Sequence, residues 1–286
     1  MTVRGTTRIF GIFGDPVAHS LSPLMQNEAL SRAGIDGIYV PFHVAPAALE
    51  QAVASLRALD IAGVNVTIPH KEAVCQYLDF VDPEARLIGA VNTIVNRDGV
   101  LCGYNTDGQG LLRSLAEDLE FTPRGKRVLL LGAGGACRAA LVALARGGAA
   151  WIGIANRTPA RAAALAEEFR TSLGGTPLAG FSLAAEDLCA LAEIDLLVNT
   201  SALGLKGESF PEIPWSSFNP GARVYDMVYT RSGTPLLHAA RDRGYAAADG
   251  LGMLAGQGEE SFALWTGIAP PSGVMKERLL AEFSGR

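Results

Sequence analysis

Short runs of β-branched and aliphatic residues alternate with longer segments that repeat their apolar positions at helical spacing, from one end of the chain to the other. The first pattern predicts strands and the second predicts amphipathic helices. Their regular alternation is typical of βαβ units, in which helices cover a mostly parallel sheet. The sequence therefore predicts an α/β fold.

The first third of the chain predicts one open sheet. Strands are expected at Arg8–Phe13, Ile38–Phe42 and Gly63–Val66, connected by amphipathic helices at Pro23–Ala33 and Ala47–Leu59. Their hydrophobic residues recur with the spacing of one helix face.

A hairpin and a helix follow this sheet. Thr93–Val95 and Leu101–Tyr104 flank Asp98-Gly99, a dipeptide that favours a tight turn between antiparallel strands. Helix Asp107–Leu119 comes next, and the polar stretch 120–126, with a proline and a glycine, interrupts the pattern. Such an interruption marks a candidate domain boundary.

A second doubly wound unit is predicted to start at the apolar strand Val128–Leu131. Its further strands and helices are predicted at Trp151–Ala155, Pro159–Arg170, Leu196–Val198, Val224–Met227, Pro235–Arg243 and Tyr245–Ala247.

Composition supports two globular domains. The chain has 286 residues, of which 49% are hydrophobic, and a net charge of -5 with no basic stripe. This charge pattern argues against nucleic acid as a partner. Arg138 and Arg146 interrupt the most apolar stretch, so no transmembrane helix is expected. Residues 1–8 lack the apolar core of a secretion signal, which predicts a cytoplasmic protein.

The four cysteines lie far apart, without paired spacing or nearby histidines. This arrangement predicts four separate buried thiols rather than disulfides or a zinc site. They are Cys75, Cys102, Cys137 and Cys189.

A glycine-rich turn follows strand Val128–Leu131. It consists of Gly132, Ala133, Gly134, Gly135 and Ala136. Gly132 permits a tight turn, Gly134 lets the backbone approach a pyrophosphate, and a helix starting near Gly135 directs its free amides at the anion. Cys137 occupies the third-glycine position, where a small side chain still allows close packing. The turn predicts dinucleotide binding, against the alternative of a ligand-free αβ turn.

The next strand ends in Asn156-Arg157-Thr158 instead of the acidic residue that binds the ribose of NAD. Arg157 and Arg161 form a cationic pair suited to a 2′-phosphate, which favours NADP. The alternative is a helix start capped by Thr158 with two solvated arginines.

Polar clusters lie at the ends of strands in the first part of the chain, where open α/β sheets place ligands. They are Ser20-Leu21-Ser22, the segment from Asn65 to Lys71, Asn92, and Asn105-Thr106-Asp107. Lys71 is the natural acid/base for an alcohol or ketone, with Asp107 as its orienting partner. The alternatives are a solvated lysine at a helix start, an N-cap aspartate, and helix caps at Ser20 and Ser22.

These residues resemble the shikimate dehydrogenases over nearly the whole chain. The matching segments are His19–Pro23, Asn65–Lys71, Gly89–Thr93, Asn105–Gly108, Gly132–Ala136, Asn156–Thr158, Asp226–Tyr229 with Thr234-Pro235, and Asp249–Leu254 with Gln257. The resemblance implies reversible reduction of 3-dehydroshikimate to shikimate by NADPH, a step of aromatic amino-acid biosynthesis, without a metal.

Residue roles follow from the same resemblance. It implies that Ser20, Ser22 and Tyr229 bind the substrate carboxylate through hydroxyl groups. Thr67, Asn92 and Gln257 would hold ring oxygens. Lys71 would deliver a proton and Asp107 would contact both Lys71 and a substrate hydroxyl. Met227 and Gly250 would border the nicotinamide.

The resemblance also implies a discontinuous first domain. Residues 1–107 plus 251–286 would form the substrate-binding catalytic domain, and residues 108–250 the NADP-binding Rossmann domain. C-terminal helices Gly252–Trp265 and Gly273–Phe283 would then fold back onto the first domain. Independently of the resemblance, the protein is expected to be a monomer or homodimer.

Three alternatives remain. A quinate/shikimate dehydrogenase using NAD shares the Lys71 and Asp107 equivalents, although Arg157 argues against NAD. A non-catalytic NADP-binding regulator would have an altered lysine or aspartate. A dehydrogenase acting on a folate is the third alternative, but Ser20, Ser22 and Tyr229 together suit a small carboxylate substrate better.

Overall fold

The computed structural model describes residues 2–189 and 191–284 and divides into two compact units. Unit 1 contains Met1–Gly110 and Leu254–Arg286, and unit 2 contains Leu111–Met253. The chain passes from one unit to the other inside helix α4 (Asp107–Leu119) and returns inside helix α9 (Leu251–Thr266). Each unit holds a six-stranded sheet, which confirms the predicted α/β fold.

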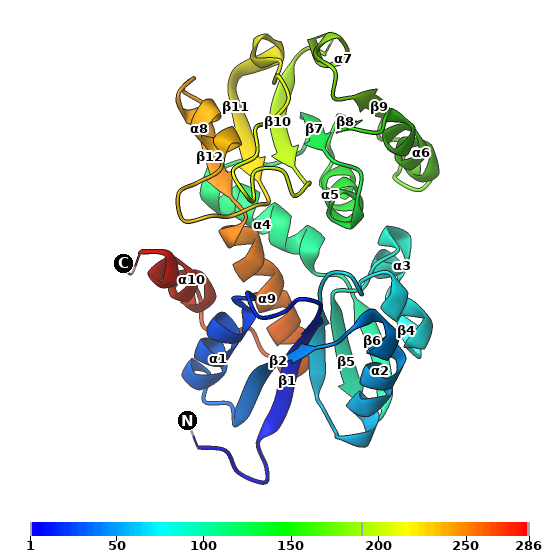
Figure 1. Ribbon diagram of the computed structural model, residues 1–286, viewed down its shortest axis with the longest axis vertical. Helices are drawn as coiled ribbons and strands as arrows, with labels where there is room; N and C mark the ends of the chain where they lie inside the picture. Colours follow the sequence, from blue (N-terminus) through cyan, green and yellow to red (C-terminus); the bar gives the residue numbers. More distant parts are fainter. Residues whose placement is uncertain (1, 190, 285–286) are drawn as a thin grey trace. The chain divides into compact units, whose positions relative to one another are not determined.

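The sheet of unit 1 has the strand order β2-β1-β3-β5-β6-β4 (Figure 1). Strands β1, β2 and β3 run parallel, while β5 is antiparallel to both β3 and β6. The strands are β1 (Arg8–Gly14), β2 (Gly37–His43), β3 (Gly63–Val66), β4 (Phe80–Val81), β5 (Thr93–Arg97) and β6 (Val100–Tyr104). The predicted hairpin is confirmed, since Asp98 and Gly99 have φ of 52° and 89°, the left-handed pair that a tight hairpin turn needs. Strand β4 was not predicted because a strand of two residues is too short to show an alternating hydrophobic pattern.

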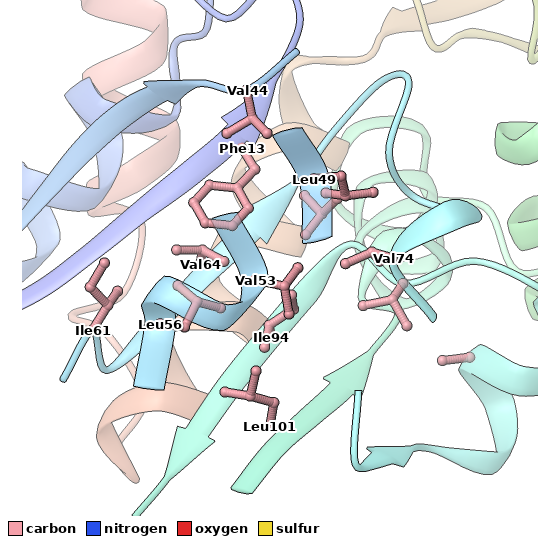
Figure 2. Close-up of a cluster of buried hydrophobic side chains, with 13 residues drawn as sticks. Phe13, Val44, Leu49, Val53, Leu56, Ile61, Val64, Val74, Ile94 and Leu101 are labelled. Atoms are coloured by element: carbon pink, nitrogen blue, oxygen red, sulfur yellow. The ribbon is translucent and has the colours of Figure 1, made fainter. Parts of the chain in front are cut away.

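Helices cover both faces of this sheet. They are α1 (Ser22–Arg32), α2 (Leu49–Ala58), α3 (Pro83–Ile88), α9 and α10 (Val274–Ser284), with 3-10 turns at η1 (Pro46–Ala48) and η2 (Ala73–Tyr77). Figure 2 shows the core under α2, where Val53 and Leu56 meet Val64 of β3 and Ile94 of β5. On α9, Trp265 packs against Phe10 and Tyr39.

The sheet of unit 2 has the order β12-β11-β10-β7-β8-β9, and every neighbouring pair is parallel. Read from the other edge, this is the 3-2-1-4-5-6 order of a Rossmann domain. Its strands are β7 (Arg127–Leu131), β8 (Trp151–Asn156), β9 (Leu178–Ser182), β10 (Ile194–Asn199), β11 (Phe218–Asp226) and β12 (Ala246–Asp249). The helices beside it are α5 (Gly135–Arg146), α6 (Pro159–Phe169), α7 (Ala185–Cys189) and α8 (Pro235–Arg241), with a 3-10 turn at η3 (Trp215–Ser217).

Two sequence expectations need correction. Strand β11 begins at Phe218 rather than Val224, because the exposed Pro220 and Gly221 are accommodated beside a register shift against β10. The cysteines are not all buried. Cys102 and Cys137 are, but Cys75 is half-buried and Cys189 exposed at the end of α7.

None of the helices in the described part of the chain has the length and apolar character needed to cross a bilayer. Across residues 2–189 and 191–284, no group of three or more histidine, cysteine, aspartate or glutamate side chains is arranged to hold a metal ion.

Candidate active site

The predicted polar residues of unit 1 gather at one edge of its sheet. Thr67 and Lys71 follow the end of β3, and Asp107 opens α4 just after β6. Asn92 precedes β5, and because β5 runs antiparallel to β3, Thr93 lies opposite Asn65 at the end of β3. Strand direction therefore collects segments that are far apart in the sequence.

Lys71 and Asp107 form a close ion pair. The Lys71 Nζ lies 2.7 Å from Asp107 Oδ2, and the two side chains are 28% and 11% exposed. The second carboxylate oxygen, Oδ1, accepts a hydrogen bond of 2.8 Å from Asn92 Nδ2. Both oxygens of Asp107 thus contact side chains, and Lys71 is held in place rather than solvated. An amine fixed in a half-open site is equipped to exchange a proton with a bound alcohol or ketone.

The backbone that carries Lys71 is anchored on both sides. The buried His70 ring contacts the Val44 carbonyl oxygen at 2.6 Å through Nε2. The Lys71 carbonyl accepts a bond of 2.8 Å from the Val91 amide. These contacts fix the loop after β3 to β2 and to the start of β5, so Lys71 projects from a rigid support.

Gln257 comes to the same place from α9. Its Oε1 accepts from Asn92 Nδ2 at 3.5 Å, and its carbonyl oxygen accepts from Thr106 Oγ1 at 3.0 Å. Gln257 lies about 150 residues beyond Asp107 in the chain and on a helix. The positions of strand ends therefore do not predict that it lies beside Asn92.

Ser20 and Ser22 stand at the start of α1. The Ser22 amide donates to Ser20 Oγ at 3.3 Å, so Ser20 assists the helix start. Ser22 is buried, at 4% exposure. Burial raises the pKa of the Tyr39 phenol well above its usual range, which keeps this group neutral. Thr67 directly follows β3, and its side chain is half-buried.

These residues contact a buried polar network. Its members are Tyr39, Asn65, Thr93, Thr106 and Ser261, all at most 4% exposed. Asn65 and Thr106 belong to polar clusters identified in the sequence, whereas no role was predicted for Tyr39, Thr93 and Ser261. Tyr39 and Asn65 occupy strand positions where apolar residues are expected, and this departure from the pattern is the signal that identifies them.

The predicted residues Met227 and Tyr229 belong to unit 2, on the loop after β11. Buried Asp226 shapes this loop, accepting from Asn199 Nδ2 at 2.7 Å, the Val228 amide at 3.0 Å and Thr234 Oγ1 at 2.6 Å. Burial raises the pKa of the half-buried Tyr229, and the Asp249 carboxylate raises it further. Tyr229 is therefore a neutral hydroxyl donor at physiological pH.

Gly250 follows β12 beside this loop. A Cβ at Gly250 would overlap the Met227 carbonyl, so only glycine permits the observed approach of the two backbones.

Asp249 provides a pH-dependent prediction. Burial raises the pKa of its carboxyl, although the Leu251 amide bond opposes the shift. A raised folded-state pKa means that stability is highest below the unfolded value and is lost as pH rises through the folded value. Asp249→Asn, which keeps an oxygen for the Leu251 amide, is expected to raise the melting temperature at pH 8 by roughly 1–3 °C. The gain should shrink towards pH 4 in thermal melts; a gain independent of pH would contradict the assignment.

The predicted glycine turn connects β7 to α5. Gly132 has φ of 112°, and a Cβ there would lie 2.9 Å from Thr200 Oγ1. At Gly134 a Cβ would meet no atom within 4 Å, so open space lies in front of the first turn of α5. The small residue at the third-glycine position, Cys137, is fully buried, and burial raises the pKa of its thiol to about 12. Ala133, Gly135 and Ala136 complete the turn and the start of α5. A pyrophosphate fits this cradle.

A cavity of about 560 Å³ adjoins the turn. Gly132, Asn156 and Arg157 line it, which unites the two segments predicted to bind NADP. Asn156 Nδ2 donates to the Thr158 carbonyl at 3.0 Å, and the Thr158 side chain does not cap α6. Arg157 and Arg161, one turn along α6, are both exposed.

Sequence reasoning missed the far wall of this cavity. Leu183 after β9 and Ser201 after β10 line it, as does Glu208. Hydrogen bonds from its own amide and the Lys206 amide hold the pKa of Glu208 below its usual range, so the wall carries a negative charge. Asn199, Thr200 and Ser201 are polar residues at the end of an apolar parallel strand, where open α/β sheets place ligands. This pattern could have identified Ser201 from the sequence.

A Rossmann unit with a glycine-rich turn that fits a pyrophosphate, joined to a second α/β unit that carries a lysine–aspartate pair, defines a two-domain, dinucleotide-dependent oxidoreductase. The family described as shikimate dehydrogenase substrate binding domain matches residues 12–94. Shikimate / quinate 5-dehydrogenase matches residues 114–198, and the shikimate 5'-dehydrogenase C-terminal domain matches residues 250–280. The chain belongs to the shikimate dehydrogenase family.

Individual relatives agree over their full lengths. The chain is 54% identical to a shikimate dehydrogenase (NADP(+)) of Geobacter metallireducens, covering 98% of this chain and 99% of that one. A shikimate dehydrogenase solved in complex with NADP+ has a TM-score of 0.89 at 35% identity, covering 99% and 98%. A Thermus thermophilus enzyme solved with NADP(H) and shikimate has a TM-score of 0.84 at 39% identity, covering 95% and 98%.

Proposed function

We propose that this protein catalyses the reversible, NADP-dependent reduction of 3-dehydroshikimate to shikimate, a step of chorismate and aromatic amino-acid biosynthesis. The observation that carries the proposal is the 2.7 Å pair of Lys71 and Asp107 in a chain of this family. A non-catalytic regulator would not need this pair, and both of its members are present.

Lys71 acts as the acid in the reducing direction. Its Nζ donates a proton to the substrate carbonyl oxygen as that oxygen becomes an alkoxide, and in the oxidising direction it accepts the proton from the hydroxyl. Asp107 orients the amine and accepts a hydrogen bond from a neighbouring substrate hydroxyl, which favours a polyol over a simple ketone. NADPH, when bound, supplies the hydride.

The remaining residues of the substrate site bind and orient. Ser20, Ser22 and Tyr229 donate hydroxyl hydrogen bonds to the carboxylate, each contributing about 1.5–3 kcal/mol because the acceptor is charged. Thr67, Asn92 and Gln257 hold the ring oxygens. Residues 1–107 plus 251–286 form the substrate-binding domain in this proposal, and residues 108–250 the NADP-binding domain.

On the cofactor side, the amides of the glycine turn bind the pyrophosphate. Asn156, Arg157, Thr158 and Arg161 surround the 2′-phosphate, while Met227 and Gly250 border the nicotinamide. The fit rests on the open space before Gly134 and on the position of Arg157 in the cavity wall.

The direct test is a spectrophotometric assay of shikimate and quinate, each with NADP+ and with NAD+. We expect the highest kcat/KM for shikimate with NADP+. Preference for quinate with NAD+ would establish the alternative dehydrogenase, whereas tight NADP+ binding without turnover of either substrate would establish a regulator.

We further propose that the protein works in the cytoplasm as a monomer or homodimer. The four cysteines are free thiols, as is usual in a reducing compartment. Sedimentation velocity at micromolar concentration distinguishes the two assembly states.

A further inference from the structure

The side-chain amide of Asn92 is held in one orientation by hydrogen bonds on both of its ends. Its Nδ2 donates to Asp107 Oδ1 at 2.8 Å and to Thr106 Oγ1 at 3.0 Å. Its Oδ1 accepts from the Thr106 amide at 2.9 Å and from Thr93 Oγ1 at 3.0 Å. An amide rotated by half a turn would place its oxygen against the Asp107 carboxylate, and the NH₂ group against two donors.

The Thr93 hydroxyl is itself oriented by the buried network. Tyr39 donates its hydroxyl proton to Asn65 Oδ1 at 2.8 Å, so the two protons of Asn65 Nδ2 face the other side. There they meet Ser261 Oγ at 3.0 Å, the Asn92 carbonyl at 3.1 Å and Thr93 Oγ1 at 3.2 Å. Ser261 Oγ lies 2.7 Å from Thr93 Oγ1. In the arrangement in which Ser261 donates to Thr93, the single Thr93 proton points to Asn92 Oδ1, 3.0 Å away.

We infer that Thr93 is a positioning residue for the Lys71–Asp107 pair, acting through Asn92. Thr93 and Ser261 are fully buried, so neither reaches a substrate. The path runs from Thr93 Oγ1 to Asn92 Oδ1, from Asn92 Nδ2 to Asp107 Oδ1, and from Asp107 Oδ2 to Lys71 Nζ. Removing the hydroxyl leaves the Asn92 oxygen with the Thr106 amide as its remaining donor, because the Thr106 hydroxyl donates to the Gln257 carbonyl. The Asn92 amide then turns more freely and Asp107 loses its fixed angle.

The inference rests on the proposed function and is tested by the kinetics of shikimate oxidation with NADP+. Thr93→Val keeps the β-branched shape and removes the hydroxyl, and we expect kcat to fall about tenfold because small misplacements of catalytic groups are costly. KM for NADP+ should stay within about twofold, since the cofactor residues lie in unit 2. Thr93→Ser restores the hydroxyl and should recover kcat to within about threefold of wild type.

The matched control is Asn96→Ala, in the same strand. Asn96 Nδ2 donates to the Leu56 and Ile61 carbonyls, both at 3.0 Å, far from the catalytic pair along β5. This variant should melt at a lower temperature with unchanged kcat. Wild-type kcat in Thr93→Val, or equal losses in the valine and serine variants, would overturn the inference; if the valine variant does not fold, Thr93→Ala replaces it under the same criteria.

A crystal structure of Thr93→Val tests the inference separately from turnover. We expect the Asn92 Nδ2 to Asp107 Oδ1 contact to be lost or the Asn92 amide to occupy two orientations. If the Asn92–Asp107 contact stays at 2.8 Å with a single amide orientation, the inference is overturned. This criterion does not depend on turnover. Inactivity of the wild-type protein on shikimate would contradict the proposed function alone.

Discussion

Replacing Lys71 with methionine is expected to lower kcat for shikimate oxidation by about 10²–10⁴-fold, the usual contribution of a positioned acid or base. Methionine retains most of the aliphatic stem and removes only the amine that contacts Asp107 at 2.7 Å. KM for shikimate and for NADP+ should change little, because the lost interaction stabilises the transition state of proton transfer rather than the bound substrate. Steady-state kinetics in both directions measures the effect.

Lys126→Met is the control for this experiment. Lys126 pairs with Asp195 at 3.5 Å in unit 2, so its loss removes one positive charge without touching the catalytic pair. Its kcat should equal that of wild type. Near-normal turnover by Lys71→Met would refute Lys71 as the proton donor, and equal losses in the two variants would indicate a general effect of charge.

The pairing of Lys71 with Asp107 was predictable because it obeys a rule that involves only strand order. Polar residues in the segments that follow strand ends meet at one sheet edge, and Lys71 after β3 and Asp107 after β6 are both of this kind. The glycine turn was predictable for a similar reason, since its strand, turn and helix are contiguous in sequence. In both cases the information lies within a few residues of the strand end.

Features set by long-range contacts were not predictable in this way. Ser261 reaches Thr93 from a helix 168 residues away in the chain, and nothing local indicates that pairing. Glu208 enters the wall of the cofactor cavity from an irregular loop, where side-chain direction follows from the tertiary fold. The early start of β11 depends on how β10 accepts a register shift, again a property of two strands rather than one.

Arg157→Ala is expected to raise KM for NADP+ by about 10–100-fold, the loss of one charge-assisted contact to a phosphate. Arg157 lines the same cavity as Gly132, and Asn156 stands where a carboxylate would otherwise bind the ribose of NAD. NAD+ has no 2′-phosphate, so its KM should change by less than about threefold. The ratio of kcat/KM for the two cofactors measures the effect.

Two controls distinguish a direct contact of Arg157 with the 2′-phosphate from a general electrostatic effect of the positive charges of unit 2. Arg170, at the end of α6, is 68% exposed and pairs with Glu167 outside the cavity, so Arg170→Ala should leave the cofactor ratio unchanged. Raising the salt concentration should weaken NADP+ binding in the wild type more than in Arg157→Ala, because added ions screen an exposed arginine–phosphate contact. Equal losses for NADP+ and NAD+ in Arg157→Ala would instead assign the arginine to a part of the cofactor that both molecules share. The preference for NADP would then have to arise from Arg161, Asn156 and Thr158, the other residues proposed around the 2′-phosphate.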